Sequence, residues 1–373
     1  MRAVVLLFAA GLCACAFQAC TVQTTTAPPP ARNVILFLGD AGGIPTLNAA
    51  SIHAYGNPRA LYIHRMPHIA LVETSAASQW VTDSAAGMTA IVTGRKTHNG
   101  VLAQSDAAVR GKQDGAPLKT ILEYAEERGL STGVISNSSV LSATPAALYA
   151  HVNDRGNVAA IFRNMLKPSF GDGVDVVIGA GRDDIEEAAK AAGTSPAAAL
   201  KAAGYETADA LEYVRPGARR VVVLLDSRFD LAAATRKAIE ILSQNPKGYF
   251  LMVESDLHTE QLVRGLERTI ALDRTIKETA ERAGPDTLIL FTADHSYDVR
   301  VHDGKRGASL LPPLDSNYGD DEDTIRLDNV RRDDDHTGEE VIAAATGPGA
   351  SRVQGVMSNV DLFGVMQSAY GWK

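Results

Sequence analysis

Short apolar runs alternate along the chain with longer stretches in which apolar residues recur every three or four positions. The short runs are typical of strands buried on both faces, and the longer pattern is typical of helices that cover a sheet. The predicted strands are residues 34–38, 69–72, 132–136, 174–178, 219–225, 249–253 and 287–291. The predicted helices are residues 84–93, 117–128, 185–203 (divided in two by Gly193 and Pro196), 229–242 and 262–283, with a short helix from residue 143 toward residue 155. This alternation predicts an α/β fold with a mostly parallel central sheet and helices on both faces.

Two stretches lack both patterns. Residues 41–65 mix glycine, proline and polar residues, and they carry no prediction of a helix or strand. Residues 297–332 are polar and include the acidic run Asp320–Asp323, so we predict a solvated loop there.

The N-terminus carries a separate signal. The apolar run Ala3–Phe17 is too short to span a bilayer, so residues 1–20 are predicted to be a signal peptide. The residues around Cys20 resemble a bacterial lipoprotein cleavage site, which makes Cys20 the candidate for lipidation; cleavage without lipid is the alternative. Residues 21–32, rich in threonine and proline, are predicted to be a spacer before a single domain of residues 33–373. We expect an exported protein, periplasmic or lipid-anchored at a bacterial membrane.

The charge and the cysteine content of the chain argue against a nucleic-acid surface and against sites that need a thiol. The chain has 44 acidic and 36 basic residues, a net charge of −8, and no basic run long enough to indicate a nucleic-acid surface. A phosphorylated substrate would therefore need local cations, which bound metal could supply. No cysteine follows position 20, which excludes an internal disulfide and a thiolate metal site in the domain.

A serine directly after an aspartate opens a run of small residues. Thr82 or Asp83 can cap the predicted helix, and Gly94 can end it. Ser84 then lies in the first turn, where unpaired N–H groups and the helix dipole favour an anion such as phosphate. A hydroxyl in that field can act as a nucleophile if a cation assists it. Serine at a helix start is more often only a cap, so the prediction depends on which residues reach Ser84.

Three apolar strands are closed within three residues by an acid, namely Asp40, Glu254 and Asp294. Ligands of open parallel sheets bind beyond the carboxyl ends of the strands, so these carboxylates are expected to converge. Three other candidate metal-binding side chains follow these acids closely, namely Asp256, His258 and His295, and His336 stands in a loop after Asp333–Asp335.

Converging carboxylates repel one another unless a cation cancels their charge. Aspartate and histidine without cysteine suit Zn²⁺, with Mn²⁺ or Co²⁺ as alternatives, and an all-oxygen site suits Mg²⁺. Two such metals about 4 Å apart assist in-line displacement at phosphorus. The sequence therefore indicates metal-dependent phosphoryl transfer.

The chain resembles the alkaline phosphatase family from Asn33 to about Phe363. Six stretches occur in family order: residues 33–40, 82–87, 143–147 followed by 151–155, 250–254, 292–295, and 336–339 followed by 347–349. The resemblance implies that Ser84 attacks phosphorus and becomes phosphoserine, and that Arg155 binds the phosphate oxygens while Asp83 holds it. It implies small phosphate monoesters as substrates, alkaline pH, weak selectivity for the alcohol, and a homodimer as one assembly.

The resemblance also implies two zinc ions and one magnesium ion. The zinc beside Ser84 would be held by Asp40, Asp294 and His295, and Asp40 would bridge to a magnesium site completed by Thr144 and Glu254. His336 would belong to the second zinc. His151 is expected to be packed in the interior rather than to bind metal.

The second zinc site departs from the family pattern. An aspartate and a histidine normally follow the glutamate at positions plus five and plus nine, but Thr259 and Val263 stand there. Asp256 and His258 are the only nearby pair, so we assign them to this zinc. Only about forty residues separate His295 from His336, which leaves no room for a large inserted crown domain.

The preferred function is hydrolysis of phosphate monoesters, and two alternatives stay open. A phosphodiesterase of the same superfamily would need room for a second ester arm. A non-catalytic phosphate- or metal-binding lipoprotein would explain the irregular segment after Glu254. A sulfatase is disfavoured, because its nucleophile is followed by x-Pro-x-Arg, which residues 85–88 do not match.

Overall fold

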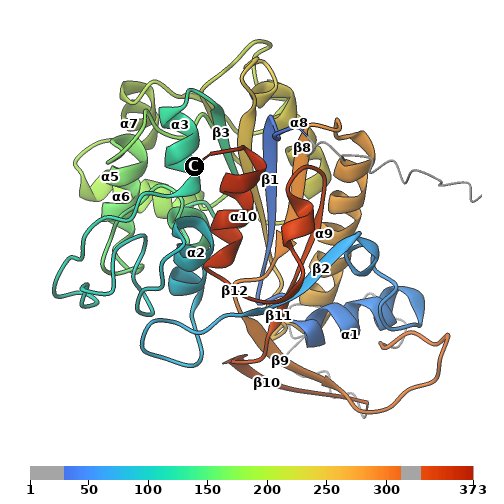
Figure 1. Ribbon diagram of the computed structural model, residues 1–373. Helices are drawn as coiled ribbons and strands as arrows, with labels where there is room; N and C mark the ends of the chain where they lie inside the picture. The colour runs from blue at the N-terminus through green and yellow to red at the C-terminus, as the bar shows by residue number, and fades with distance from the viewer. Residues whose placement is uncertain (1–28, 312–328, 373) are drawn as a thin grey trace, which may run out of the picture.

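The computed structural model describes residues 29–311 and 329–372. Within these residues, ten strands form one central sheet (Figure 1). In spatial order the strands are β12 (Gly355–Ser358), β2 (His68–Glu73), β11 (Val341–Thr346), β8 (Thr287–Thr292), β1 (Asn33–Asp40), β7 (Tyr249–Asp256), β3 (Ser131–Ser139), β4 (Val176–Ala180), β6 (Val221–Leu224) and β5 (Glu206–Ala208). From β8 to β5 every neighbouring pair is parallel, whereas β11 runs antiparallel to both β8 and β2. The predicted mostly parallel α/β fold is confirmed.

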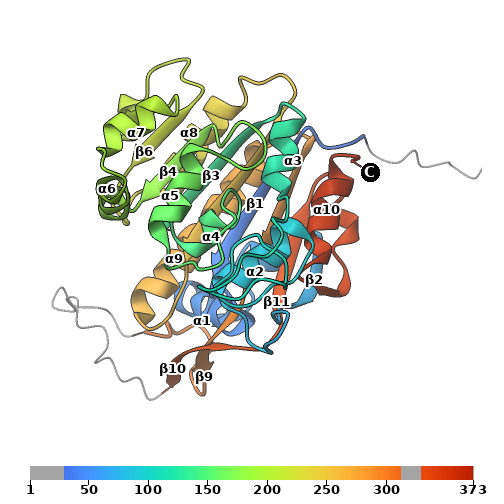
Figure 2. The same cartoon turned by 90° about the vertical axis from the view of Figure 1, so that its left-hand side faces the viewer.

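Helices cover both faces of this sheet (Figures 1 and 2). Along β1, Val34, Leu36 and Leu38 join one hydrophobic cluster, while Ile35 and Phe37 join another on the opposite face. The helices contributing to the first cluster are α2 (Ser84–Thr93), α3 (Ile121–Glu127), α4 (Ala143–Ala146), α5 (Val158–Leu166), α6 (Arg182–Ala191), α7 (Pro196–Ala202) and α10 (Asp361–Ala369). The α-helices contributing to the second are α8 (Leu231–Leu242), α9 (Leu262–Arg282) and, through Leu47, α1 (Ile44–Tyr55). Burial on both faces explains why the strands are continuous apolar runs.

Several helices differ from the predictions. The helix expected from residue 117 begins at Ile121, because Thr120 and Glu123 form a capping box. The helix expected after residue 143 ends at Ala146, so it does not reach residue 155. Residues 41–65, without a prediction, contain α1 (Ile44–Tyr55), which packs against α9. The structure also has short 3₁₀ helices at Ile63–Arg65, Leu211–Tyr213 and Ala350–Arg352.

The prediction of a polar loop over residues 297–332 is partly wrong. Strand β9 (Ser296–Val301) pairs antiparallel with β10 (Val330–Thr337) as a separate two-stranded sheet beside α1 (Figure 1). Arg332 pairs with Val299 and His336 with Tyr297, so three residues of β10 lie opposite one residue of β9. This bulge occurs directly before His336 and sets the direction in which the strand presents it. The acidic run Asp320–Asp323 lies outside the described residues.

Packing of the domain begins slightly before residue 33. Ala31 is buried and its N–H donates to the Ala369 carbonyl at 2.7 Å, and Arg32 forms an ion pair with Asp286 at 3.1 Å. The predicted signal peptide, Cys20 and most of the spacer lie outside the described residues. Among the described helices, none combines the length and apolar character that crossing a membrane requires.

Candidate active site

The carboxyl ends of three adjacent strands bring the predicted acids together. Strand β1 lies between β8 and β7, and Leu38 pairs with both Thr292 and Glu254. Asp40 therefore projects between the end of β7 and the Asp294–His295 turn after β8. The next residue, Ala41, has a φ of 65°, which is uncommon for a residue with a side chain. Its N–H donates to Asp294 Oδ1 at 3.3 Å, so this turn ties the two strand ends together.

Ser84 is the first residue of α2 and points at this cluster. Asp83 rather than Thr82 caps the helix, since its carboxylate accepts from the Ala86 N–H at 3.0 Å. Ser84 is 3 % exposed, and its Oγ lies 3.4 Å from Asp40 Oδ1 and 3.4 Å from His295 Nε2. The hydroxyl is thus placed at a helix N-terminus and beside the acids, as the sequence predicted.

Arg155 approaches the same place from the loop after α4. Its Nη1 donates to Asp83 Oδ2 at 3.1 Å, and the Gly100 N–H donates to that oxygen at 2.9 Å. The Arg155 backbone is fixed as well, because its N–H donates to the Gly100 carbonyl at 2.7 Å. The Asp83 carboxylate therefore both caps α2 and orients the guanidinium of Arg155.

Two groups of side chains could each hold a metal ion. In one group Asp40, Asp294 and His295 offer ligand atoms within 4.8 Å of one another, and in the other His258, His295 and His336 do. Thr144 Oγ1 donates to Asp40 Oδ2 at 3.2 Å, which places Thr144 on the far side of that carboxylate.

The three histidines are oriented in a common way. His295 Nδ1 faces the Ser296 carbonyl at 3.1 Å, His336 Nδ1 faces the Thr82 carbonyl at 3.1 Å, and His258 Nδ1 faces Asp256 Oδ1 at 2.8 Å. An acceptor at Nδ1 favours the tautomer whose Nε2 lone pair is available to a metal. The rings of His295 and His336 are stacked with centroids 3.8 Å apart. The imidazoles are thus preset as nitrogen ligands.

The buried acids lack the partners that their charge requires. Among the described residues, three buried carboxylate oxygens have no hydrogen-bond partner of ordinary geometry: both oxygens of Glu254, and Oδ2 of Asp294. Burial and the charge of Asp40 raise the pKa of Glu254 well above its usual value and the pKa of Asp294 to about 7. Burial would also raise the pKa of Asp40, but the hydrogen bond with His295 and the charge of His258 hold it well below its usual range. Unpartnered buried oxygens beside preset imidazoles fit divalent cations.

Asp256 lies outside both groups of side chains. Its Oδ2 accepts from Arg268 Nη1 at 2.7 Å and its Oδ1 accepts from His258. Burial would lower the pKa of His258, but the hydrogen bond with Asp256 and the charge of Asp40 raise it to about 10. The structure therefore brings His258 to the cluster, with Asp256 orienting it, and direct metal binding by Asp256 stays a prediction.

Some residues of the site carried no signal in the sequence. The Tyr297 ring lies 4.9 Å from that of His258, edge to face, and Arg268 reaches the site from one turn inside α9. Tyr297 follows the 292–295 stretch by two residues, but nothing in the sequence marks it or Arg268 as a site residue, so only the fold could reveal them. His151 is packed in the interior as expected: its Nε2 lies 2.8 Å from Glu123 Oε1 and its Nδ1 2.7 Å from the Ala103 carbonyl.

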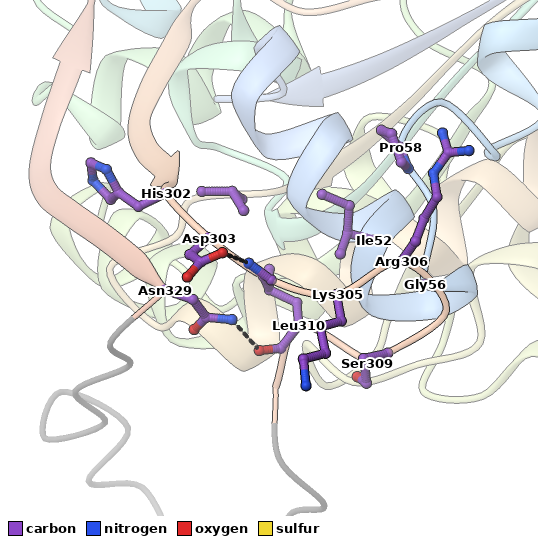
Figure 3. A pocket seen from close by; sticks show the side chains of 13 residues that line it. Ile52, Gly56, Pro58, His302, Asp303, Lys305, Arg306, Ser309, Leu310 and Asn329 are labelled. Carbon is purple, nitrogen blue, oxygen red and sulfur yellow. Dashed lines mark hydrogen bonds between the residues drawn. The ribbon is translucent and has the colours of Figure 1, made fainter.

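A separate pocket of about 380 Å³ lies at the other end of β9 (Figure 3). It is lined by Ile52 of α1 and by the loop that includes His302, Asp303, Lys305 and Arg306. It shares no residue with the Ser84 cluster, so it is distinct from the candidate active site.

Comparisons with known proteins agree with this geometry. The family model for alkaline phosphatase matches residues 31–209 and 224–313. The streptomycin-6-phosphate phosphatase of Streptomyces griseus is 30 % identical over 95 % of this chain and 93 % of its own length. The alkaline phosphatase of Escherichia coli K12 is 29 % identical over 95 % and 89 %.

Solved structures share the fold. The alkaline phosphatase of the Antarctic bacterium TAB5 superposes with a TM-score of 0.74 at 23 % identity, covering 92 % of this chain and 99 % of its own. That of Thermus thermophilus gives a TM-score of 0.75 at 21 % identity, covering 97 % and 96 %. A buried serine hydroxyl at a helix N-terminus, the converging acids and imidazoles, and the matched family model lead to one conclusion: this chain belongs to the alkaline phosphatase family and is a phosphoester hydrolase.

Proposed function

We propose that the protein hydrolyses phosphate monoesters in two displacements at phosphorus, with Ser84 as the nucleophile. Ser84 Oγ forms a bond to phosphorus while the ester P–O bond breaks, and the departing alcohol takes up a proton. Water then attacks the phosphoserine, which releases inorganic phosphate and restores the hydroxyl. The observation that carries the proposal is the position of Ser84 Oγ, 3.4 Å from both Asp40 and His295 at the start of α2.

The side chains of the site divide the remaining tasks. Asp40 Oδ1 and His295 Nε2, each 3.4 Å from Ser84 Oγ, fix the position of the hydroxyl among the acids. Arg155, held by Asp83, supplies a planar guanidinium that can bind two phosphate oxygens at once. The N–H groups at the start of α2 favour the same dianion. Binding energy is thereby concentrated on the phosphate group.

The unpartnered acids support metal sites in the family arrangement. Two zinc ions and one magnesium ion, when bound, would supply positive charge that favours an ionised hydroxyl and stabilises phosphate oxygens. The proposed residues are Asp40, Asp294 and His295 for the first zinc, His258, His336 and Asp256 for the second, and Asp40, Thr144 and Glu254 for magnesium. A variant of the TAB5 alkaline phosphatase has magnesium bound in a site named M3, which is consistent with a third metal.

The test uses Ser84→Ala with purified protein and an aryl phosphate. We expect loss of phosphate release with unchanged metal content, and an acid-stable phosphoserine in the wild type alone after brief exposure to labelled substrate. Ser78→Ala, in the exposed loop before the helix, is the matched control and should keep full activity. Normal turnover by Ser84→Ala would refute the proposal, and metal binding without any turnover by the wild type would favour the non-catalytic alternative.

A second comparison separates monoester from diester hydrolysis. Turnover of a diester at a higher kcat/KM than its monoester would establish the phosphodiesterase alternative. Because the S. griseus relative is named for streptomycin 6-phosphate, that compound belongs among the candidate substrates.

We further propose that residues 33–373 act as one catalytic domain exported by the N-terminal signal, with Cys20 as the lipidation candidate and a homodimer as one assembly.

A further inference from the structure

Trp80 lies beside the Ser84 cluster and is 92 % exposed. Large aromatic side chains bury 150–250 Å² where they pack, so a fully exposed indole is uncommon. Trp80 stands four residues before Ser84, in the loop that leads into α2. Its carbonyl and the Val81 side chain lie against Gly338, where an added Cβ would be 3.5 Å from each. Trp80 therefore lies between the segments that supply Ser84 and His336.

The loop that carries Trp80 is fixed to the site. Asn99 Nδ2 donates to the Val81 carbonyl at 3.1 Å, and the Thr82 carbonyl accepts from His336 Nδ1 at 3.1 Å. Asn99 Oδ1 accepts from the Asp83 N–H at 3.2 Å. Because Asn99 and His336 both bond to residues 81–83, the backbone next to Trp80 is fixed at the rim while the indole stays exposed.

The surroundings of His336 are acidic. Residues 331–340 contain two arginines and five carboxylates, the latter all exposed: Asp333, Asp334, Asp335, Glu339 and Glu340. His336 pairs with Tyr297 across the β9–β10 sheet, so Asp335, the residue before His336, lies at the same edge of the site. The rim on this side of the site therefore presents negative charge next to an open aromatic face.

We infer that Trp80 and the acids of residues 333–335 contact the alcohol part of the substrate and select phosphate monoesters whose alcohol carries a cation, such as a quaternary ammonium group. This rests on the proposed monoesterase function. An aromatic face and nearby carboxylates both attract cations, and a tryptophan face typically contributes about 2- to 30-fold in affinity. Metal ions, when bound, would place their positive charge at the phosphate, and Asp40, Asp294 and Glu254 would offset part of it, whereas Trp80 and residues 333–335 lie at the rim. The weak selectivity implied by the family resemblance would then not extend to charged alcohols.

The test compares two substrates of nearly the same shape. Choline phosphate carries a trimethylammonium group, and 3,3-dimethylbutyl phosphate carries a neutral tert-butyl group in its place. The readout is the ratio of their kcat/KM values in each variant divided by that ratio in the wild type, which cancels their different intrinsic reactivity. Trp80→Leu keeps apolar bulk without the aromatic face, and Asp334→Asn removes one charge.

We expect the ratio to fall about 3- to 30-fold in Trp80→Leu, mainly through a higher KM for choline phosphate. Trp80→Phe should recover part of the loss. Asp334→Asn should lower the ratio about 2- to 5-fold, with the effect disappearing at high salt. Tyr213→Leu, which alters an aromatic residue 70 % exposed in a different segment, is the control and should leave the ratio unchanged.

An unchanged ratio in Trp80→Leu would overturn the inference. If kcat/KM falls equally on both substrates, Trp80 only supports the loop; if neither kcat/KM changes, the indole does not contact the alcohol. If a dimer also converts to a monomer, measured by light scattering, Trp80 belongs to an interface between copies. If the wild type hydrolyses neither substrate nor an aryl phosphate, the proposed function itself fails.

Discussion

Glu126 of α3 is a buried acid whose charge should set the alkaline limit of stability. It is 6 % exposed, its Oε1 accepts from Thr132 Oγ1 at 3.1 Å, and its Oε2 accepts from the Gly173 N–H at 3.0 Å. Burial raises its pKa to about 8, and the charges of Asp172 and Glu123 add to the increase, against the two hydrogen bonds. Glu126→Gln should therefore stabilise the protein at high pH, because the amide resembles the protonated acid.

The magnitude follows from the difference between the folded and unfolded pKa values. A folded pKa of about 8 against a reference of 4.5 means that the native state holds a proton that the unfolded chain loses. The contribution to stability is complete below pH 4.5 and is lost as the pH rises to 8. At about 1.36 kcal/mol per pKa unit the loss is on the order of 5 kcal/mol, a large share of a typical free energy of unfolding.

The assay is urea unfolding of wild type and Glu126→Gln at pH 5 and pH 9, with metal content held equal. The difference in free energy of unfolding between the two proteins should change by several kcal/mol in favour of the variant at pH 9. Glu127→Gln, which alters an exposed neighbour paired with Lys119 at 2.6 Å, is the control and should change stability by no more than about 1 kcal/mol. A Glu126→Gln difference that is the same at both pH values would refute the reasoning.

Three further predictions concern charges near the site and in the core. Arg155→Lys should lower kcat/KM for an aryl phosphate about 100-fold, because an ammonium ion cannot bind two oxygens in a plane; a change below threefold would contradict the role of Arg155. Glu123→Ala should lower the free energy of unfolding by about 3–5 kcal/mol in urea titrations, since it leaves buried His151 without its partner at 2.8 Å; an effect under 1 kcal/mol would show that the imidazole is neutral. Glu254→Gln should raise the Tm of chelator-treated protein, because it removes a buried acid without a partner, and should reduce the gain in Tm on adding Mg²⁺. Scanning calorimetry measures both effects, and an unchanged response to Mg²⁺ would show that Glu254 does not bind the metal.

The centre of the fold could be predicted because its signals are local. β1, β7 and β8 are apolar runs followed by acids, and parallel strands in one sheet place such acids at one edge. The bounds of α2 were also predictable from a run of small residues that ends at Gly94, although the sequence left Thr82 and Asp83 as alternative caps and the structure shows Asp83. These features depend on neighbours in sequence, so they required no knowledge of the tertiary structure.

The periphery could not be predicted because its elements depend on distant partners. β10 is mostly polar and becomes a strand only by pairing with β9 across the intervening loop. β12 is four residues long and exists because β2 lies beside it. α1 lacks a clear apolar face, because Thr46 and Ser51 are buried while Ile44 and Tyr55 are exposed, and it is stabilised by packing on α9. Sequence patterns at these positions are too short or too polar to distinguish from loops.

The shortened segment after Glu254 shows how the fold can compensate for a changed spacing. β7 continues to Asp256, which pairs with Asp40 of β1, so His258 follows directly at the edge where the acids converge. α9 then packs so tightly on this turn that a Cβ at Gly265 would lie 2.5 Å from the His258 carbonyl. Only a glycine permits that approach, and it fixes the backbone that presents the imidazole. The imidazole is thereby held by strand pairing and helix packing instead of by the longer loop of the family pattern, and Gly265→Ala should displace it even though residue 265 contributes no side chain to the site.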